Sequence, residues 1–303
     1  ADAVHPGYGF LSENPAFREA CDAAGVTFIG PPASAMRAMG DKVSARRTAQ
    51  AAGVPVTPGA ELPNPNDAAA VIAAAERVGF PLLVKAARGG GGKGIRLVER
   101  KEEMVEAVRR AASEAKTSFG SDVVYIERFV EKPRHVEIQV IVDDHGHAVA
   151  VGERECSVQR RHQKIIEETP SCAVSDDLRR RMEAAAVAVA NAVGYRNAGT
   201  VEFLVGADRS FYFMEMNTRL QVEHPITEMR YGVDLVREQF RIAEGQPLSF
   251  GATPPAPRGC AIEARVCAED AANGFLPSTG HVTALQLPGG PGVRIDGHLF
   301  TGQ

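Results

Sequence analysis

The sequence lacks the features that mark several large classes of protein. None of its apolar runs approaches the roughly 20 residues that a membrane-spanning helix needs. With 34 Lys and Arg against 38 Asp and Glu the net charge is −4, so there is no positive excess for binding nucleic acid. The 44% of hydrophobic and 24% of charged residues exclude a disordered, collagen-like or coiled-coil chain. The length of 303 residues predicts about two globular domains.

Cysteine is sparse and forms neither a disulfide framework nor a zinc pattern. The five cysteines are an odd number, their spacing is irregular, and no C-x-x-C occurs. We therefore expect free thiols in a reducing compartment. An internal repeat is also absent, which excludes a solenoid.

The two ends of the sequence lack the marks of a complete protein. There is no initiator Met, and residues 3–5 have the pattern of a strand. The sequence closes within another strand pattern, at 293–295, followed by 298–300. We expect a fragment of a longer protein, in which a targeting peptide lies outside the sequence or is absent.

Helix and strand patterns alternate along the chain. Expected helices, most of them with an Asn, Asp or Ser cap or a final glycine, cover 15–24, 41–52, 67–78, 102–115 and 175–193. Expected strands cover 26–29, 81–85, 95–98, 123–127, 135–142, 148–152, 201–205 and 211–216. Residues 135–142 alternate polar and apolar, which predicts a half-buried strand. The proline-rich stretch 55–65 is expected to be a connector. The mixture predicts an α+β fold with a piece of parallel α/β structure at the front.

A glycine run lies between two of the expected strands. Residues 88–94 read Arg-Gly-Gly-Gly-Gly-Lys-Gly, and Lys85 ends the strand before them. A strand follows instead of the helix that a Rossmann fingerprint opens, and Gly94 follows the lysine, unlike a Walker A loop. Backbone N–H groups of such a loop can close over phosphates, with Lys85 and Lys93 as cations. A flexible linker is the alternative.

Carboxylates gather on one expected hairpin. Glu202 lies in its first strand, and Glu215 and Asn217 lie two apart at the end of its second strand. Period two places Glu215 and Asn217 on one face, and the hairpin brings Glu202 onto the neighbouring strand. Two carboxylates and an amide oxygen are hard ligands that suit Mg²⁺ with bridging phosphates. A solvent-facing strand edge is the alternative.

A charged run, Gln159 to Lys164, follows the expected strand pair at 135–152. By itself such a run is typical of a solvated face. Its position after the strand pair, and the need for cations near a triphosphate, favour a phosphate or anion site.

The order of these residues along the chain resembles that of the ATP-grasp superfamily: Lys85, the glycine run, Glu202, Glu215 and Asn217. Three longer motifs resemble biotin carboxylase: HPGYGFLSEN at 5–14, ECSVQRRHQK at 155–164 and EMNTRLQVEHP at 215–225. This family includes the biotin carboxylase subunit or domain of acetyl-CoA, propionyl-CoA, methylcrotonyl-CoA and pyruvate carboxylases. The resemblance covers essentially the whole sequence. It implies an ATP-grasp fold with a partial Rossmann-like N-terminal domain and the start of a β-rich C-terminal subdomain.

The resemblance also implies a division of the chain. It comprises a partial N-terminal α/β domain at 1–30, a linker helix region at 31–57, an ATP-grasp lid at 58–130, a catalytic subdomain at 131–245 and a partial C-terminal domain at 246–303. The lid is expected to close over ATP. The remaining parts of the two terminal domains are expected to lie outside this sequence.

The resemblance assigns roles to individual residues. Those implied to bind ATP are Lys42, Lys85, Gly91, Gly92, Glu127, Arg128, Phe129, Val130, His135, Gln159, His162, Glu202 and Glu215. Those implied to hold Mg²⁺ or Mn²⁺ are Glu202, Glu215 and Asn217. Those implied to surround bicarbonate are Lys164, Arg219, Gln221, Val222 and Glu223. Tyr8 and Arg265 would meet the biotin ring. Two positions depart from the family: Arg128 stands where Lys is usual, and Arg88 where Gly is frequent.

The implied reaction is the carboxylation of biotin with ATP and bicarbonate. ATP would phosphorylate bicarbonate to carboxyphosphate, a step that depends on positioning and electrostatics. Glu223 is the natural general base for the bicarbonate proton. Carboxyphosphate would break to CO₂ and phosphate, and the phosphate would take the N1′ proton of biotin. Lys164, Arg219 and Arg265 complete the implied catalytic set, the two arginines stabilising the developing enolate.

The implied partners are a biotin carboxyl carrier protein or domain and a carboxyltransferase. The chain has Met-Glu-Met at 214–216 but no Met-Lys-Met, so it carries no biotin itself. We expect a homodimer when the protein is complete and a cytoplasmic location, with import of a longer precursor as the alternative. The final carboxyl acceptor is not set by this sequence. The alternative functions are a carbamoyl-phosphate-synthesising type of ATP-grasp ligase, which also activates bicarbonate, and an inactive nucleotide-binding module.

Overall fold

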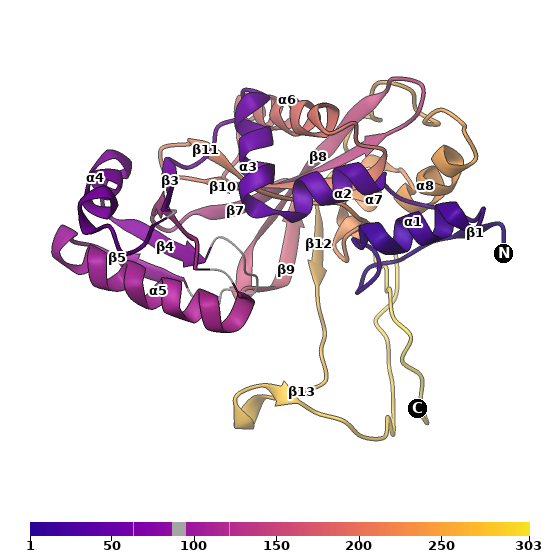
Figure 1. The fold of residues 1–303 in the computed structure, drawn as a ribbon. Helices are drawn as coiled ribbons and strands as arrows, with labels where there is room; N and C mark the ends of the chain where they lie inside the picture. Colours follow the sequence, from indigo (N-terminus) through magenta and orange to yellow (C-terminus); the bar gives the residue numbers. More distant parts are fainter. Residues whose placement is uncertain (63, 87–94, 121) are drawn as a thin grey trace. The chain divides into compact units, whose positions relative to one another are not determined.

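The computed structural model describes residues 1–62, 64–86, 95–120 and 122–303 (Figure 1). The chain divides into two compact units, Ala1–Ala264 and Arg265–Gln303. Among the helices of the described residues, none is long and apolar enough to cross a membrane.

The larger unit begins with a strand–helix–strand segment. β1 (Ala3–Val4) and β2 (Thr27–Phe28) pair in parallel, and α1 (Pro15–Ala23) connects them. The Asn14 side chain caps α1 by accepting two backbone N–H hydrogen bonds of its first turn. The parallel arrangement predicted from the sequence is therefore confirmed, and α2 (Ala33–Gly40) follows it.

An antiparallel sheet of four strands forms the next part of the chain. In spatial order its strands are β3 (Gly59–Leu62), β6 (Val124–Arg128), β4 (Leu82–Ala86) and β5 (Arg96–Val98). Two helices and a short 3₁₀ turn accompany it: α4 (Ala68–Val78), η1 (Lys101–Glu103) and α5 (Met104–Phe119). Leu82, Val84 and Ile126 of the strands are fully buried in the core shared with these helices.

The proline-rich stretch at 55–65 differs from its expected role as a connector. Its residues 59–62 form β3, which pairs with β6 at the edge of the four-stranded sheet. The expectation is wrong at this point because tertiary pairing can place an edge strand in a segment with proline nearby.

A second sheet, of six antiparallel strands, forms the centre of the larger unit. In spatial order its strands are β11 (Phe211–Asn217), β10 (Asn197–Val205), β7 (Arg134–Val142), β8 (Ala148–Arg160), β9 (Gln163–Thr169) and β12 (Ala261–Ala264). The two hairpins predicted from the sequence, β10 with β11 and β7 with β8, are confirmed. β8 extends to Arg160, past its predicted end at 152, because its second half pairs with β9.

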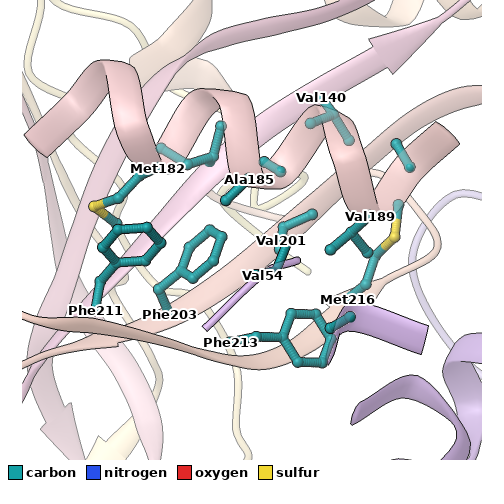
Figure 2. Close-up of a cluster of buried hydrophobic side chains, with 14 of the residues drawn as sticks. Val54, Val140, Met182, Ala185, Val189, Val201, Phe203, Phe211, Phe213 and Met216 are labelled. Carbon is teal, nitrogen blue, oxygen red and sulfur yellow. The ribbon is translucent and has the colours of Figure 1, made fainter. Parts of the chain in front are cut away.

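Helices pack on both faces of the central sheet. α3 (Lys42–Ala51) and α6 (Asp176–Ala192) share one core with β7, β10 and β11. α7 (His224–Tyr231) and α8 (Leu235–Ala243) share a second core with Ile141 and with residues of β8. Figure 2 shows the first core, in which the side chains of β10 and β11 lie under α6. The rings of Phe203 and Phe211 meet there edge to face, with centroids 5.5 Å apart.

β7 is buried on both of its faces, which corrects the expectation of a half-buried strand. Val136 and Ile138 enter the core under α6, whereas Glu137 and Gln139 lie on the opposite face and are also 0% exposed. The alternating pattern separates the two faces correctly but does not reveal what covers the polar one. These buried polar groups form the centre of the candidate site.

The smaller unit contains little regular structure among its described residues. β13 (Glu269–Asp270) and β14 (Leu276–Pro277) pair across a 3₁₀ turn, η2 (Ala271–Asn273). The strand patterns at 293–295 and 298–300 are not strands, so that expectation is wrong. A strand needs a partner for its backbone N–H and C=O groups, and no described strand pairs with these segments.

Replacing Phe203 with Ala is expected to lower the free energy of unfolding by about 3–5 kcal/mol, because it leaves a cavity under α6. Urea-induced unfolding followed by circular dichroism measures this change. Phe10→Ala removes the same side chain from a fully exposed position and should change stability by less than about 0.5 kcal/mol. A Phe203→Ala protein as stable as Phe10→Ala would contradict the packing described here.

Candidate active site

A row of charged residues crosses the polar face of the central sheet. Arg154 on β8, Glu137 on β7, Glu202 on β10 and Glu215 on β11 are successive cross-strand partners. Cβ atoms of such partners lie about 5 Å apart, so one cation and three carboxyl groups share a narrow strip. The predicted juxtaposition of Glu202 and Glu215 is therefore present in the structure.

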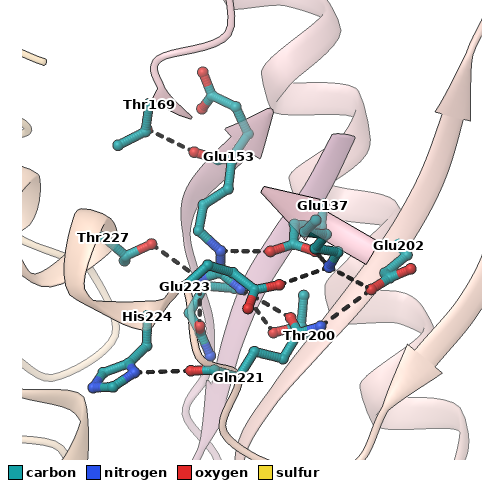
Figure 3. A network of polar contacts seen from close by, with 12 residues as sticks. Glu137, Glu153, Thr169, Thr200, Glu202, Gln221, Glu223, His224 and Thr227 are labelled. Atoms are coloured by element: carbon teal, nitrogen blue, oxygen red, sulfur yellow. Dashed lines mark hydrogen bonds and ion pairs between the residues drawn. The ribbon is translucent and has the colours of Figure 1, made fainter. Parts of the chain in front are cut away.

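Arg154 is fully buried, and each of its five N–H groups donates to another side chain. Nε donates to Glu137 Oε1 at 2.6 Å. The terminal nitrogens donate to Gln139 at 2.6 Å, Thr227 at 3.1 Å, Thr200 at 3.0 Å and Gln221 at 3.0 Å. Figure 3 shows these acceptors converging from two strands, the loop after β11 and α7. An unpaired buried charge would cost several kcal/mol, so the complete set of partners is what permits a guanidinium in this interior.

Lys164 on β9 connects three carboxylates. Its Nζ donates to Glu137 Oε2 at 2.5 Å, Glu223 Oε1 at 2.6 Å and Glu202 Oε1 at 2.8 Å. Burial alone would lower the pKa of Lys164, but the surrounding carboxylates, Glu137 first, raise it well above its ordinary value. Burial would likewise raise the pKa of Glu137, but the charges of Lys164 and Arg154 hold it below its usual range. Lys164 and Glu137 are therefore ionised at neutral pH.

Glu202 is the most heavily hydrogen-bonded carboxylate of the row. Besides Lys164, its Oε1 accepts from Asn217 Nδ2 at 2.8 Å and Gln221 Nε2 at 3.1 Å. Its Oε2 lies 2.9 Å from His135 Nε2. Although burial opposes it, the hydrogen bond with His135 and the charge of Lys164 keep the pKa of Glu202 far below its ordinary value. Since Glu202 is only 3% exposed, the alternative of a solvent-facing strand edge does not apply to it.

Within the described parts of the chain, Glu215 differs from the other carboxyl groups of the row in its lack of a hydrogen-bond donor. Among the described residues, none hydrogen-bonds to it, and burial together with the charge of Glu202 raises its pKa. A divalent cation between Glu215 and Glu202 would relieve this repulsion, and carboxylate oxygens are the ligands that Mg²⁺ prefers. Asn217 directs Nδ2 toward Glu202, whereas its Oδ1 accepts from Arg219 at 3.4 Å. Its amide would have to turn over to offer an oxygen to a cation between the carboxylates.

The loop after β11, residues 218–223, brings the expected bicarbonate-binding residues together. Gln221 bonds both Arg154 and Glu202, Glu223 is 2% exposed and bonds Lys164, and Val222 is half-buried between them. Arg219 Nε donates to Glu13 Oε2 at 3.0 Å. The loop is therefore held from the sheet at Gln221 and Glu223 and from the N-terminal segment at Arg219.

Two of the residues expected to bind ATP adjoin the charged row. Gln159 Nε2 lies 2.9 Å from His135 Nδ1, and the other ring nitrogen of His135 faces Glu202. The contact with Glu202 outweighs burial and raises the pKa of His135. Lys42 begins α3 with an exposed side chain whose charge acts on Glu215.

The other expected ATP-binding residues lie on the four-stranded sheet or at turns. Lys85 on β4 forms an ion pair with Glu127 on β6. The N–H groups of Arg128 and Phe129 donate to the carbonyls of Pro58 and Pro81 at 2.8 and 3.0 Å, so these two backbone donors are already engaged. Val130 follows them in a loop, and His162 lies in the tight β8–β9 turn with a φ of 66°. Gly91 and Gly92 lie outside the described residues.

The two residues expected to meet biotin lie in different units of the chain. Tyr8, in the loop between β1 and α1, is half exposed, and Arg265 is the first residue of the smaller unit. Their juxtaposition therefore stays a prediction.

Three residues of the site were not predicted from the sequence: Arg154, Glu137 and Glu13. Glu137 had a signal, because it shares the polar face of the 135–142 pattern with His135. Arg154 had none, since a lone arginine within a strand is ordinarily exposed. Glu13 lies inside the 5–14 motif, but no spacing relates it to Arg219, which is 206 residues away.

Family models match three consecutive parts of the chain. Residues 1–36 match the biotin carboxylase N-terminal domain, and residues 263–303 match the biotin carboxylase C-terminal domain. Between them, residues 41–250 match the ATP-binding domain of the carbamoyl-phosphate synthase L chain. The order of the three matches follows the order of the motifs in the sequence.

Curated proteins resemble the chain from end to end. It is 51% identical to the biotin carboxylase of Haemophilus influenzae over 302 residues, which cover 100% of this chain and 67% of that protein. It is 48% identical to a pyruvate carboxylase subunit of Methanothermobacter thermautotrophicus, covering 99% of this chain and 61% of that one. It is 50% identical to a chloroplastic biotin carboxylase of Arabidopsis thaliana, covering 98% of this chain and 55% of that protein.

Solved structures agree with these relatives. The biotin carboxylase of Campylobacter jejuni, in complex with a β,γ-ATP compound, has a TM-score of 0.91 and 45% identity, covering 100% of this chain and 67% of that chain. The biotin carboxylase domain dimer of Hydrogenobacter thermophilus 2-oxoglutarate carboxylase, with MgADP and bicarbonate, has a TM-score of 0.89 and 41% identity over the same shares.

Replacing Arg154 with Met is expected to lower the free energy of unfolding by about 3–5 kcal/mol, because Glu137 and four other buried acceptors lose their donor. Urea-induced unfolding measures the loss. The double variant Arg154→Met with Glu137→Gln should lose less, because no buried carboxylate is then left without its guanidinium.

The matched control is Arg180→Met. Arg180 forms an exposed pair with Asp177 at 3.3 Å, so its loss should cost less than about 1 kcal/mol. Equal stability of the Arg154→Met and Arg180→Met proteins would show that the buried network is not needed to hold the sheet and α7 together.

Proposed function

The chain belongs to the biotin carboxylase family, and on that premise we propose that its site carboxylates biotin with ATP and bicarbonate by way of carboxyphosphate. Biotin carboxylases are ATP-dependent ligases that join a carboxyl group to a nitrogen of biotin. The observation that carries the proposal is the contact of Lys164 Nζ with Glu223 Oε1 at 2.6 Å, because Glu223 lies in the same loop as Arg219 and Gln221. Lys164 and Gln221 also donate to the same oxygen, Glu202 Oε1. A protonated lysine and an arginine can bind a small anion, and the carboxylate of Glu223 can take the proton of that anion.

Bicarbonate activation requires an anion site and a base in contact. In the proposed step the bicarbonate anion lies between Lys164 and Arg219, with Gln221 and Val222 beside it. A bicarbonate oxygen attacks the γ-phosphorus of ATP, and the bond from that phosphorus to the β–γ bridging oxygen breaks. Glu223 takes the bicarbonate proton, so the products are carboxyphosphate and ADP. Because Lys164 is held as a cation by its carboxylate partners, it serves as a fixed charge and not as the base.

The nucleotide is proposed to lie between the two sheets of the larger unit. Lys42 and Lys85 supply cations for its phosphates, residues 127–130 accompany the adenine, and His135, Gln159 and His162 adjoin the nucleotide. Mg²⁺, when bound by Glu202, Glu215 and Asn217, neutralises charge on the phosphate oxygens. The lid and catalytic subdomains at 58–130 and 131–245 remain part of the proposal, and the two separate sheets are consistent with them.

The second step transfers the carboxyl group to biotin. Carboxyphosphate breaks into CO₂ and phosphate, and the phosphate removes the N1′ proton of biotin so that N1′ attacks CO₂. Arg219 and Arg265 are proposed to stabilise the enolate form of the biotin ring, and Tyr8 to contact the ring.

Biotin reaches such a site on a carrier, and the carboxyl group leaves to a carboxyltransferase. We include both partners in the proposal, together with a homodimer, since a relative with 41% identity is described as a domain dimer. A cytoplasmic location belongs to the proposal as well. Bacterial and chloroplastic proteins are both among the relatives.

A carbamoyl-phosphate-synthesising ligase is the other bicarbonate-activating function to weigh. The match of residues 41–250 to a carbamoyl-phosphate synthase ATP-binding domain agrees with either activity. The biotin carboxylase matches on both sides of it favour biotin as the acceptor.

ADP release by the full-length enzyme with MgATP is expected to require bicarbonate and to rise when free biotin is added. Arg219→Ala should lower this rate by about 10²–10³, the scale for one preorganised donor, because the anion loses one of its two cations. A coupled ADP assay with each substrate omitted in turn gives the rates.

The matched control is Arg237→Ala, which removes an exposed arginine of α8 and should retain the full rate. ADP release that needs bicarbonate but ignores biotin would favour the carbamoyl-phosphate type. An Arg219→Ala enzyme that keeps more than half of the rate would contradict the role of this residue.

A further inference from the structure

We propose that Glu13 is a positioning residue for bicarbonate, which orients the guanidinium of Arg219 from the N-terminal segment. The inference rests on the proposed function and adds a residue that acts through Arg219 without touching a substrate. Glu13 lies just before α1, in the loop that also carries Tyr8. It thereby links the strand–helix–strand segment to the loop 218–223.

Both oxygens of the Glu13 carboxylate are used by that loop. Oε1 accepts from the backbone N–H of Thr218 at 2.8 Å and from the Thr218 hydroxyl at 3.2 Å. Oε2 accepts from Arg219 Nε at 3.0 Å. One carboxylate therefore fixes the start of the loop and the direction of the arginine together.

The contact at Nε determines which N–H groups of Arg219 remain for an anion. Nη1 donates to the Leu220 carbonyl at 3.2 Å and Nη2 to Asn217 Oδ1 at 3.4 Å. With Nε bonded to Glu13, three of the five guanidinium N–H groups have partners among the described residues. The two that remain are on the terminal nitrogens, which are the atoms that bind a planar carboxylate-like anion as a fork.

Glu13 is also the one carboxylate among the described residues that pairs with Arg219. Glu137, Glu202 and Glu223 all pair with Lys164. The two cations of the proposed bicarbonate site thus have separate acidic partners. The Arg219 side chain is 24% exposed, so without Glu13 it would have room for other rotamers. The loss of Glu13 should therefore weaken the binding of bicarbonate.

Steady-state ADP release by the full-length enzyme, with bicarbonate and ATP varied separately, tests the inference. Glu13→Gln is expected to raise the KM for bicarbonate about tenfold, the scale of one charge-assisted hydrogen bond, and to change the KM for ATP less than about twofold. Glu19→Gln is the matched control, since Glu19 pairs with Arg37 at 2.6 Å on the exposed surface of the same segment. It should change neither KM.

A double-mutant cycle separates positioning from a general structural effect. In an Arg219→Ala background, Glu13→Gln should change kcat/KM for bicarbonate by less than about twofold, because Glu13 has no guanidinium left to orient. The inference would be overturned if the effects of Glu13→Gln and Arg219→Ala on kcat/KM for bicarbonate simply multiplied in the double variant. An equal rise in the KM for ATP and for bicarbonate, or an unchanged KM for bicarbonate, in Glu13→Gln would overturn it as well. If Glu13→Gln does not fold, Glu13→Asp keeps the charge on a shorter side chain, and its KM for bicarbonate must rise for the inference to stand.

The failure of this inference differs from the failure of the proposed function. A wild-type enzyme without bicarbonate-dependent ADP release overturns the proposed function, and this inference with it. A wild-type enzyme that has this activity, with Glu13→Gln unchanged beside it, overturns the role of Glu13 alone.

Discussion

The buried guanidinium of Arg154 is the interaction on which the site depends. Its five hydrogen bonds connect β8 to β7 and β10, to the loop 218–223 through Gln221, and to α7 through Thr227. Because all five acceptors are themselves buried or nearly so, none of them can exchange its partner for water. The loop that presents Arg219 and Glu223 is thus fixed by a residue that has no proposed contact with a substrate.

The charges around that guanidinium bear on how one strip of the sheet could bind both of the proposed ions, bicarbonate and Mg²⁺. Arg154 and Lys164 neutralise most of the charge of Glu137, Glu202 and Glu223, and these carboxylates keep Lys164 protonated beside the proposed bicarbonate position. The negative charge that no ion pair among the described residues neutralises lies at the other end of the row, where burial and the charge of Glu202 raise the pKa of Glu215. In the proposed function a divalent cation binds there and bicarbonate binds beside Lys164, so that the γ-phosphoryl group and its acceptor meet between them.

Local signals predicted many of the helices and strands, whereas the contacts of the charged side chains were harder to predict. Caps and glycines located α1, α3, α4 and α6, and the hairpin pattern placed Glu202 beside Glu215. Period two could not show that the polar face of β7 is buried, because the groups that cover it come from β8, β9 and the loop 218–223. The role of Glu13 depends on a contact across 206 positions, which no local pattern encodes. The strand patterns near 293–300 failed because a strand also requires a partner.

Transfer of an oxygen atom from bicarbonate to phosphate tests the central claim most directly. The full-length enzyme would be given ¹⁸O-labelled bicarbonate, unlabelled MgATP and free biotin, and the released phosphate analysed by mass spectrometry. The account predicts one labelled oxygen in each phosphate released, because a bicarbonate oxygen attacks the γ-phosphorus and stays with it when carboxyphosphate breaks. Phosphate without label, formed at the same rate as ADP, would mean that water attacks ATP and that this site does not activate bicarbonate.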